Sequence, residues 1–573
     1  MDYQLEQVSQ EPVVNIAIDT LKRHKQALIF CNSKRSAQKT AADIAKETGK
    51  ETNKPKTAAA SIPADNHSEH KPSEQLLTHH EQLKELAKKI LDALPTPTDQ
   101  CQKLAHGIER GVAFHHAGLS TSQREDIENA FRAGTLKLIC CTPTLAAGLD
   151  MPAFRTVLKE LRRYSGSFGM QYIPVLEYQQ MAGRAGRPGK EDFGEAIMIA
   201  STDKERQNLI DTYIHGEVED IYSKLAVEPV LRTYVLSLVA TGLCRSRHDL
   251  VTFFSQTFWA HHYKDMPQME RIITRVIKLL INYEFVFDAN AKKNMEKNAA
   301  DTLAKSSDKS SNAKLRQSIG IEFESAADLI AETNQVLGVT PLGQRVSQLY
   351  IDPLSANHLL KGMKSEKMTE FGLFTLLNQT LEMRPLLRAK SSELDNINQF
   401  LFTNEQDLLI PVPTMYDLEY EDFFNALKTT QYVIDWINEF DENQLFEKYN
   451  IRPGEINAKN DILDWLLYCC SELTSVINKK QHIGFIAKLR TRLQYGAKEE
   501  LLPLLVLKGV GRVRARKLIH ANIRTIAELK SVDIGKLGII VGPAIAADLK
   551  TQVGAGVPKN EKKERLAWQQ ELL

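Results

Sequence analysis

The chain has 573 residues, of which 43% are hydrophobic and 25% are charged. A chain of this length does not fold around one core, and at about 100–200 residues per domain it predicts roughly three to five domains. The seven cysteines include no C-x-x-C pair, which argues against zinc ribbons, metal clusters and a disulfide scaffold and fits a reducing cytoplasm. We therefore expect no metal site and a cytoplasmic or nucleoid-associated protein.

The distribution of charge says more than its sum. The formal net charge is +1, but residues 479–517 include eleven Lys or Arg residues and two acids. Like charge at this density predicts a polyanionic partner. The first residues lack the apolar core of a signal peptide, and no window approaches about 18 uncharged apolar residues, so we expect no membrane partner.

Residues 1–202 alternate between strand and helix patterns, which predicts an α/β domain with a mainly parallel sheet. A polar loop insertion is expected at 49–75 and a hairpin at 156–178, with a Gly/Ser tip at 165–169. The helix at 121–134 is expected to start at a Thr121 cap and to stop at Gly134. Buried strands are expected at 26–33 and 136–142, a strand and a turn at 111–119, and another strand at 195–201. Further helices are expected at 33–47, 76–95 and 99–110.

The rest of the chain is predicted to be mostly helical. Residues 203–340 carry helical patterns around a Lys-, Asn- and Ser-rich insert at about 289–316, and residues 341–500 are almost all helix, with loops near 404–414 and 450–456. A basic block at 501–555 and a polar tail at 556–573 complete the chain. The expected fold class is multidomain, α/β followed by all-α.

Two motifs carry chemistry. "TPTLAAGLDMPA" (142–153) follows a predicted buried strand directly, where parallel sheets bind ligands, and it offers the Thr142 hydroxyl, Gly148 for close approach and the Asp150 carboxylate. An ordinary strand-to-helix turn is the alternative.

The second motif is "YQQMAGRAGRP" (178–188), with Gln180, Gly183, Arg184 and Arg187 in a Q-x-x-G-R-x-G-R pattern. Small neighbours let a phosphate approach, and a guanidinium grips phosphate oxygens with a planar fork. The alternative is a surface helix with two solvated arginines.

Together with "ALIFCNSKRSA" (27–37) and "FHHAGL" (114–119), these stretches resemble motifs IV, IVa, V and VI of superfamily 2 helicases of the Ski2-like group. The resemblance implies that 1–202 is the second RecA-like domain of a motor. It further implies that Arg184 and Arg187 are arginine fingers for the γ-phosphate of ATP. The other residues that the resemblance implicates are Gln180, which positions nucleotide or water, Gly148, Asp150 and Gly183 at the nucleotide cleft, and Ser33, Arg35 and Thr142 on the DNA backbone.

The resemblance continues downstream. The hairpin at 156–178 occupies the place of the family's strand-separating hairpin, with Tyr164 and Phe168 near its tip, although it could simply pack on a neighbouring domain. Residues 203–340 resemble the winged-helix domain, and 341–500 resemble the helical ratchet bundle. Trp465 stands where the family has a base-stacking tryptophan; a core tryptophan is the alternative. The arginine expected about two turns earlier is replaced by Asn457 and Ala458, with Lys459 the nearest cation.

The C-terminal block "LLVLKGVGRVRARKLIHANIRTIAELK" (504–530) has the pattern of a helix-hairpin-helix. Its glycines bring backbone N–H groups to a DNA phosphate, and cations stand beside them. The residues expected to bind DNA here are Lys508, Gly509, Gly511, Arg512 and Arg514. This domain resembles that of the archaeal and HelQ-type repair helicases rather than the RNA-processing relatives.

The 573 residues contain no G-x-x-x-x-G-K-[ST] loop, and "FDEN" (440–443) is not a DExH box. The resemblance places these motifs in a first RecA-like domain, which would precede residue 20 and would bind most of the ATP and Mg²⁺. We therefore expect the C-terminal part of an ATP-dependent 3′–5′ DNA helicase of repair or stalled forks, which binds single-stranded or forked DNA and needs a separate RecA-like domain or subunit. The alternatives are a non-catalytic DNA-binding adaptor and a fragment of an RNA helicase.

Overall fold

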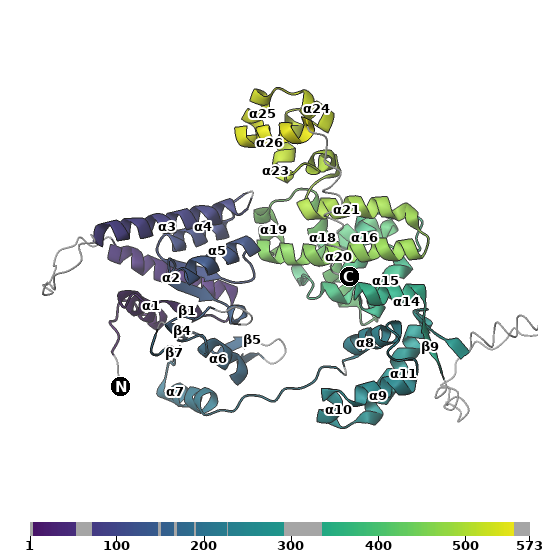
Figure 1. Cartoon of the computed structure of the whole chain (residues 1–573), viewed down its shortest axis with the longest axis horizontal. Helices are drawn as coiled ribbons and strands as arrows, with labels where there is room; N and C mark the ends of the chain where they lie inside the picture. The colour runs from purple at the N-terminus through teal and green to yellow at the C-terminus, as the bar shows by residue number, and fades with distance from the viewer. Residues whose placement is uncertain are drawn as a thin grey trace, which may run out of the picture. The chain divides into compact units, whose positions relative to one another are not determined.

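The computed structural model describes residues 4–52, 72–94, 96–146, 151–164, 169–187, 189, 191–225, 227–290 and 335–554. The chain folds into two compact units (Figure 1). The first unit comprises Met1–Asp220 and Asp441–Ala458, and the second comprises Ile221–Phe440 and Lys459–Leu573. The expected insert at about 289–316 and the tail at 556–573 lie outside the described residues, apart from residues 289 and 290.

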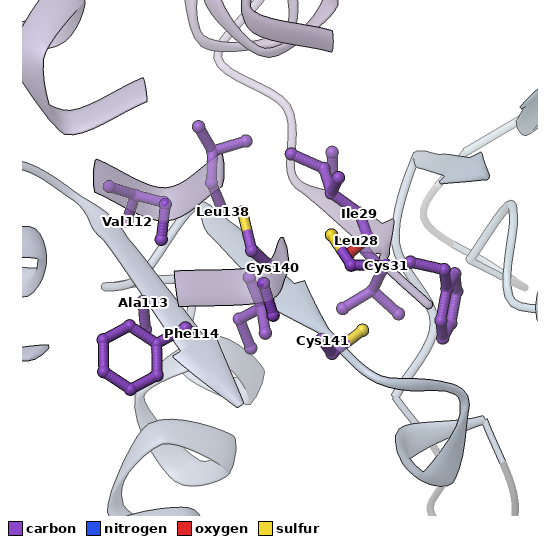
Figure 2. Close-up of a cluster of buried hydrophobic side chains, with 14 of the residues drawn as sticks. Leu28, Ile29, Cys31, Val112, Ala113, Phe114, Leu138, Cys140 and Cys141 are labelled. Carbon is purple, nitrogen blue, oxygen red and sulfur yellow. The ribbon is translucent and has the colours of Figure 1, made fainter. Parts of the chain in front are cut away.

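A five-stranded parallel sheet forms the centre of the first unit, with strand order β2-β3-β1-β4-β7. The strands are β1 (Ala27–Phe30), β2 (Val112–His115), β3 (Leu138–Cys141), β4 (Arg155–Leu158) and β7 (Glu195–Met198). In β1 to β4 every residue is buried, as continuous apolar runs between two helical layers require. Figure 2 shows part of this core, including the thiols of Cys31, Cys140 and Cys141. The expected parallel α/β sheet is confirmed.

Helices cover the sheet: α2 and α4 pack on β2, α2 also packs on β3, and α6 packs on β4. The helices are α1 (Pro12–Lys22), α2 (Lys34–Thr52), α3 (Pro72–Asp92), α4 (Asp99–Ile108), α5 (Thr121–Arg132), α6 (Val175–Ala182), α7 (Asp203–Leu209) and α19 (Glu442–Tyr449). The polar loop insertion expected at 49–75 lies largely outside the described residues. Its first residues belong to α2, which continues to Thr52, and its last residues belong to α3, which begins at Pro72.

The start of α5 differs from the prediction by one residue. Ser120, not Thr121, is the N-cap: its hydroxyl accepts from Gln123 N, and the Gln123 side chain accepts in return from the Ser120 backbone. This reciprocal pair satisfies two amides at once, which Thr121 cannot do from inside the first turn. The end is as expected, since Gly134 adopts a φ of 80° just beyond the helix.

The hairpin expected at 156–178 is shorter. Its first part is β4, buried in the central sheet between β1 and β7, and its last part is α6, which starts after Pro174. The hairpin itself pairs β5 (Arg162–Tyr164) with β6 (Met170–Tyr172). A buried parallel strand and a hairpin strand have similar apolar sequences, so the pattern alone does not separate them.

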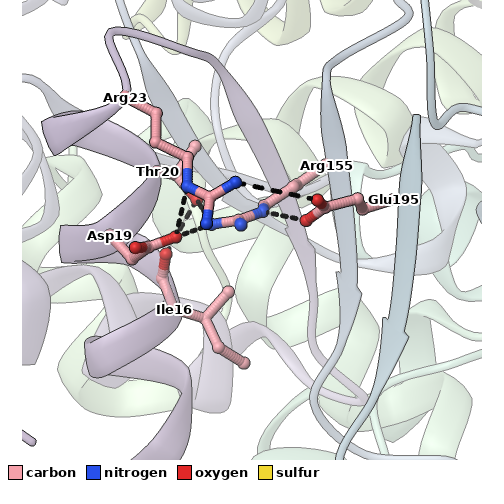
Figure 3. A network of polar contacts seen from close by, with 6 residues as sticks. All are labelled: Ile16, Asp19, Thr20, Arg23, Arg155 and Glu195. Carbon is pink, nitrogen blue, oxygen red and sulfur yellow. Dashed lines mark hydrogen bonds and ion pairs between the residues drawn. The ribbon is translucent and has the colours of Figure 1, made fainter. Parts of the chain in front are cut away.

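A buried arginine ties α1 to the sheet (Figure 3). Arg155, only 2% exposed, begins β4. Its Nη1 donates to Asp19 Oδ2 at 2.5 Å and to Thr20 Oγ1 at 3.0 Å, and its Nε donates to Glu195 Oε2 at 2.5 Å. One guanidinium therefore joins α1, β4 and β7.

The second unit is built from helices and one small antiparallel pair, β8 (Val286–Asp288) with β9 (Leu337–Val339). Its first helices are α8 (Glu228–Ala240), α9 (Arg247–Ser255), α10 (Phe258–Tyr263) and α11 (Met266–Asn282). The bundle that follows comprises α14 (Pro341–Leu349), α15 (Pro353–Met363), α16 (Glu370–Asn378), α17 (Leu394–Asn404), α18 (Tyr420–Ile437), α20 (Pro453–Val476, which begins in the first unit) and α21 (Ile483–Tyr495). The last helices, around their own apolar core, are α22 (Leu502–Leu505), α23 (Arg512–His520), α24 (Ile526–Ser531), α25 (Ile534–Val541) and α26 (Pro543–Gly554).

The loop expected near 450–456 is shorter, because α19 ends at Tyr449 and α20 begins at Pro453. Among the described helices, none has the length and apolar character needed to cross a membrane.

Candidate nucleotide and DNA site

A groove of about 630 Å³ opens at the carboxyl edge of the sheet in the first unit. Asn32–Arg35 follow β1, Ala117 follows β2, and Thr142 and Thr144 follow β3. Because parallel strands end at the same edge, three segments that are far apart in sequence meet here. The groove brings together Ser33, Arg35 and Thr142, which were singled out from two separate motifs.

The hydroxyls of the groove are held by local hydrogen bonds. Ser33 Oγ accepts from Ser36 N at 3.1 Å, at the start of α2. Thr142 N donates to His115 O at 3.2 Å, and the Thr142 and Thr144 hydroxyls lie 2.9 Å apart. Ser33 and Arg35 are exposed. Fixed hydroxyls beside an exposed guanidinium are suited to the oxygens of a phosphate backbone.

Sequence reasoning missed four polar groove residues, Asn32, Lys34, Asn450 and Arg452. Asn450 and Arg452 arrive from the segment Asp441–Ala458, which returns to the first unit. Gly454 makes this return possible, since a Cβ there would lie 2.2 Å from Ala117 O. Lys34 Nζ bonds to Glu455 of the same segment. No local pattern announces a contact across more than 400 residues.

His116 follows β2, directly before Ala117 of the groove, and is fully buried. Burial, with the nearby charges of Arg452 and Lys34, lowers the pKa of His116 to about 3. The imidazole is therefore neutral at physiological pH, and its Nδ1 accepts from Gly118 N at 3.1 Å. Its Nε2 lies 3.0 Å from Gln38 Nε2. His116 shapes the loop after β2 and adds no charge to the groove.

The two arginines of the Q-x-x-G-R-x-G-R motif contact the segment that follows β3. Arg184 Nη2 donates to Ala146 O at 2.6 Å, and Arg187 Nε donates to Pro152 O at 3.1 Å. The backbones are joined as well, with Ala153 N donating to Arg184 O at 2.9 Å. The two motifs therefore form one structural unit, although Gly148 and Asp150 lie outside the described residues.

The other residues of this motif lie at the exposed end of α6. Gln180 and Gly183 are exposed, and Gly183 caps the helix. Gly186 has a φ of 91°, and its backbone packs so closely on Gly194 that a Cβ at Gly194 would lie 2.1 Å from Gly186 N. Small residues here serve this backbone packing.

A carboxylate from outside the motif holds the start of α6. Glu219 Oε1 accepts from Val175 N at 2.6 Å, and Oε2 accepts from Leu176 N at 3.0 Å. These backbone bonds to Leu176 and Val175 lower the pKa of Glu219. Sequence reasoning missed this cap, because Glu219 lies more than 40 residues after the helix it caps.

The three aromatic residues predicted to contact DNA are Tyr164, Phe168 and Trp465. Phe168 and the Tyr164 side chain lie outside the described residues. Trp465, on α20, is neither buried nor fully exposed. Its neighbour Asp464 is bound by Arg490 through two hydrogen bonds of 2.9 and 2.8 Å. Base stacking by Trp465 stays a prediction.

The C-terminal hairpin has the glycine geometry expected of it. Gly509 has a φ of 79°, Gly511 caps α23, and the space around both Cα atoms is open. Lys508 and Arg514 are exposed beside them. Arg512 instead packs on the helical bundle: its guanidinium stacks on the Trp436 ring at 4.6 Å and donates to Phe440 O at 3.1 Å.

Much of the basic stretch 479–517 is neutralised by acids. Arg490 pairs with Asp464, Lys479 with Glu366, Arg492 with Glu370, Lys488 with Glu499, and Arg516 with Glu439 and Glu500. The charge available to a polyanion is therefore smaller than the sequence suggests. Within the described part of the chain, Lys508, Arg514 and Lys517 form no ion pair, and they lie at or next to the hairpin.

Comparison with known families defines the class. The family model described as "Helicase conserved C-terminal domain" matches residues 84–189, "Helix-turn-helix domain" matches 194–287, and "Archaeal helicase, domain 4" matches 371–496. The first match includes β2, β3, β4 and the paired motifs, so this part of the sheet is that of a helicase C-terminal domain, and helix-turn-helix and helical domains follow it.

Individual relatives narrow the family. The chain is 33% identical to the ATP-dependent DNA helicase Hel308 of Methanocella arvoryzae, over 98% of this chain and 68% of the relative. It is 34% identical to the Hel308 helicase of Methanococcus vannielii (90% and 64%) and 31% identical to that of Pyrococcus abyssi (92% and 63%). The chain belongs to the Hel308 family of archaeal helicases, as the motifs predicted, and it spans about two thirds of the length of these relatives.

Proposed function

We propose that this chain forms the DNA-tracking and arginine-finger part of an ATP-dependent 3′–5′ DNA helicase that acts in repair or at stalled forks, in the cytoplasm. The observation that carries the proposal is the groove of the first unit. It gathers Ser33, Lys34, Arg35, Thr142 and Arg452 along one sheet edge.

The chemistry of the groove suits one strand of DNA. Three cations and two hydroxyls contact phosphates without reading bases, so binding is independent of sequence and weakens with salt. The hydroxyl of Thr142 and the backbone at the end of β3 fix the position of the DNA strand in the groove. A motor that moves along any sequence needs this kind of contact.

The arginines connect this groove to nucleotide. Arg184 and Arg187 rest on the carbonyls of Ala146 and Pro152, in the segment that begins at Thr142. From here they would hold the γ-phosphate of ATP and would supply positive charge, which in arginine fingers accelerates hydrolysis by about 10³–10⁵. Gln180, Gly183, Gly148 and Asp150 complete this side of the cleft.

ATP and Mg²⁺ are bound mainly by a RecA-like domain with a Walker loop and a DExH box, since those motifs do not occur in these 573 residues. The chemistry that this chain supplies is positive charge at the phosphate. The RecA-like domain that carries the Walker loop and the DExH box is a separate domain or a separate subunit.

The remaining predicted residues are assigned to contacts with DNA. Tyr164 and Phe168 separate the duplex, Trp465 stacks on a base, which is worth about 1–3 kcal/mol, and the hairpin with Gly509 and Gly511 grips a phosphate through its amides. Beside it, Lys508 and Arg514 supply the charge. We assign Arg512 to packing against Trp436 rather than to DNA.

The test is ATP turnover with a RecA-like domain that carries the Walker loop and DExH box added in trans. We expect DNA-stimulated hydrolysis that is lost in Arg187→Ala and kept in Arg132→Ala, an exposed arginine on α5. Turnover that is insensitive to Arg187→Ala contradicts the finger role. Intact DNA binding without any turnover would favour the adaptor.

A further inference from the structure

One loop of the second unit exposes large apolar side chains. Between α17 and α18, Met415, Tyr416 and Leu418 are 69%, 90% and 97% exposed. The loop is held in shape, since Asp417 Oδ2 accepts from Thr414 N at 2.7 Å and from Thr414 Oγ1 at 2.9 Å. Ordered and fully exposed apolar side chains are a mark of an interaction site.

The charge around this loop disfavours nucleic acid as its partner. Residues 391–427 include eight Asp or Glu residues and no Lys, Arg or His. Three of these acids, Glu393, Asp407 and Asp422, pair with cations from outside this range, so the net charge around the loop stays negative. Among the residues that the structure describes, Glu419 and Glu421 beside the loop have no ion-pair partner. The loop therefore fits an apolar hollow with a positively charged rim.

The first unit has such a hollow. A groove of about 640 Å³ lies between α2 and α4. Its floor is made of small and apolar residues, and no acid lines it: Ala41, Ala45, Gly49, Gly107 and Phe114. Lys46, Lys50, Lys103 and Arg110 stand along its rim.

The rim charges are accessible. Lys50 pairs with Glu47 and Lys103 with Asp99, but both lysines are about 60% exposed, so these pairs are weak and easily exchanged. Lys46 and Arg110 form no ion pair within the described ranges, and the Arg110 guanidinium donates only to His106. Lys46 and Arg110 are therefore available to pair with acidic residues of a partner.

We propose that the loop around Met415–Leu418 of one copy of this chain docks in the α2/α4 groove of a second copy. Tyr416 and Leu418 enter the apolar floor, and Glu419 and Glu421 meet Lys46 and Arg110. The two surfaces differ, so the contact is heterologous and can extend to further copies. This contact is independent of the DNA groove and of the arginine fingers.

The test uses two surface variants of the whole chain. Tyr416→Ser/Leu418→Ser removes the loop surface, and Lys46→Glu/Arg110→Glu reverses the groove charge. In sedimentation velocity we expect the wild type to gain mass with concentration and to lose this gain at high salt. Each variant alone stays monomeric. An equimolar mixture of the two forms a heterodimer, because each supplies the surface that the other lacks.

A labelled peptide of residues 411–422 provides the second measurement. It should bind the wild-type chain and bind the groove variant at least roughly tenfold more weakly. Ile539→Ser, which alters an exposed apolar residue of α25 (87% exposed), is the matched control and should self-associate normally. A wild-type chain that is monomeric at all concentrations, or a mixture that forms no heterodimer, overturns the proposal, including the case in which the loop docks within its own chain.

Discussion

At the scale of single residues, Arg155 joins three elements of the first unit. It is buried and bonds to Asp19, Thr20 and Glu195 on two other elements. Removing it leaves the two carboxylates with Arg23, a partly exposed cation whose nitrogens lie 3.0 Å from Asp19 and 3.9 Å from Glu195. Breaking a buried pair costs about 3–5 kcal/mol, and because Glu195 is partly exposed the lower end applies here.

We therefore expect Arg155→Met to lower the free energy of unfolding of the first unit by about 3 kcal/mol. Hydrogen exchange of the β4 and β7 amides in urea measures it. Lys22→Met, which removes an exposed pair with Glu6, should cost less than about 1 kcal/mol. Equal losses in the two variants would show that the Arg155 network contributes only surface electrostatics.

At the scale of elements, α6 depends on a cap from a distant segment. Pro174 offers no side-chain cap, and the Glu219 carboxylate takes two of the first amides. Its folded-state pKa lies below the ordinary 4.5. The cap therefore stabilises the helix above the unfolded pKa, and this contribution is lost as the pH falls through the folded pKa.

Glu219→Ala should thus destabilise α6 by about 1 kcal/mol at neutral pH. The difference from the wild type should shrink below about pH 4.5, the ordinary pKa of a Glu side chain, and disappear as the pH falls through the lower folded-state pKa. Hydrogen exchange of the Val175 and Leu176 amides in both proteins, in steps of about one pH unit between about pH 3 and 7, measures this difference. A difference that is constant across this range would mean that charge is not what caps the helix.

Local sequence patterns predicted the helices and strands well. They predicted poorly which elements lie next to one another in the fold. The strand at 27–30 and the helix after Ser33 follow from apolar runs and caps that a short window contains. The hairpin predicted at 156–178 is too long, because β4 is identified as part of the central sheet only by its pairing with β1 and β7. Ser120 rather than Thr121 caps α5 because the bond that decides it involves the Gln123 side chain.

At the scale of the whole chain, the same limit governs the candidate site. Ser33, Arg35 and Thr142 could be selected from motifs, since each follows a predicted strand. Arg452 could not, because its place depends on the return of Asp441–Ala458 to the first unit. Likewise the basic stretch looks free in the sequence, but acids such as Glu366, Glu370 and Asp464 neutralise it in the fold.

The central claim is that the groove at the edge of the sheet holds single-stranded DNA. Fluorescence anisotropy of a labelled oligothymidine tests it directly, with Arg35→Ala/Arg452→Ala against Lys22→Ala/Arg132→Ala, two exposed cations of the same unit. We predict at least roughly tenfold weaker binding for the groove variant, with a salt slope reduced by about 0.7 for each phosphate that the variant no longer neutralises, and unchanged binding for the control. Equal binding by the two variants would contradict the account.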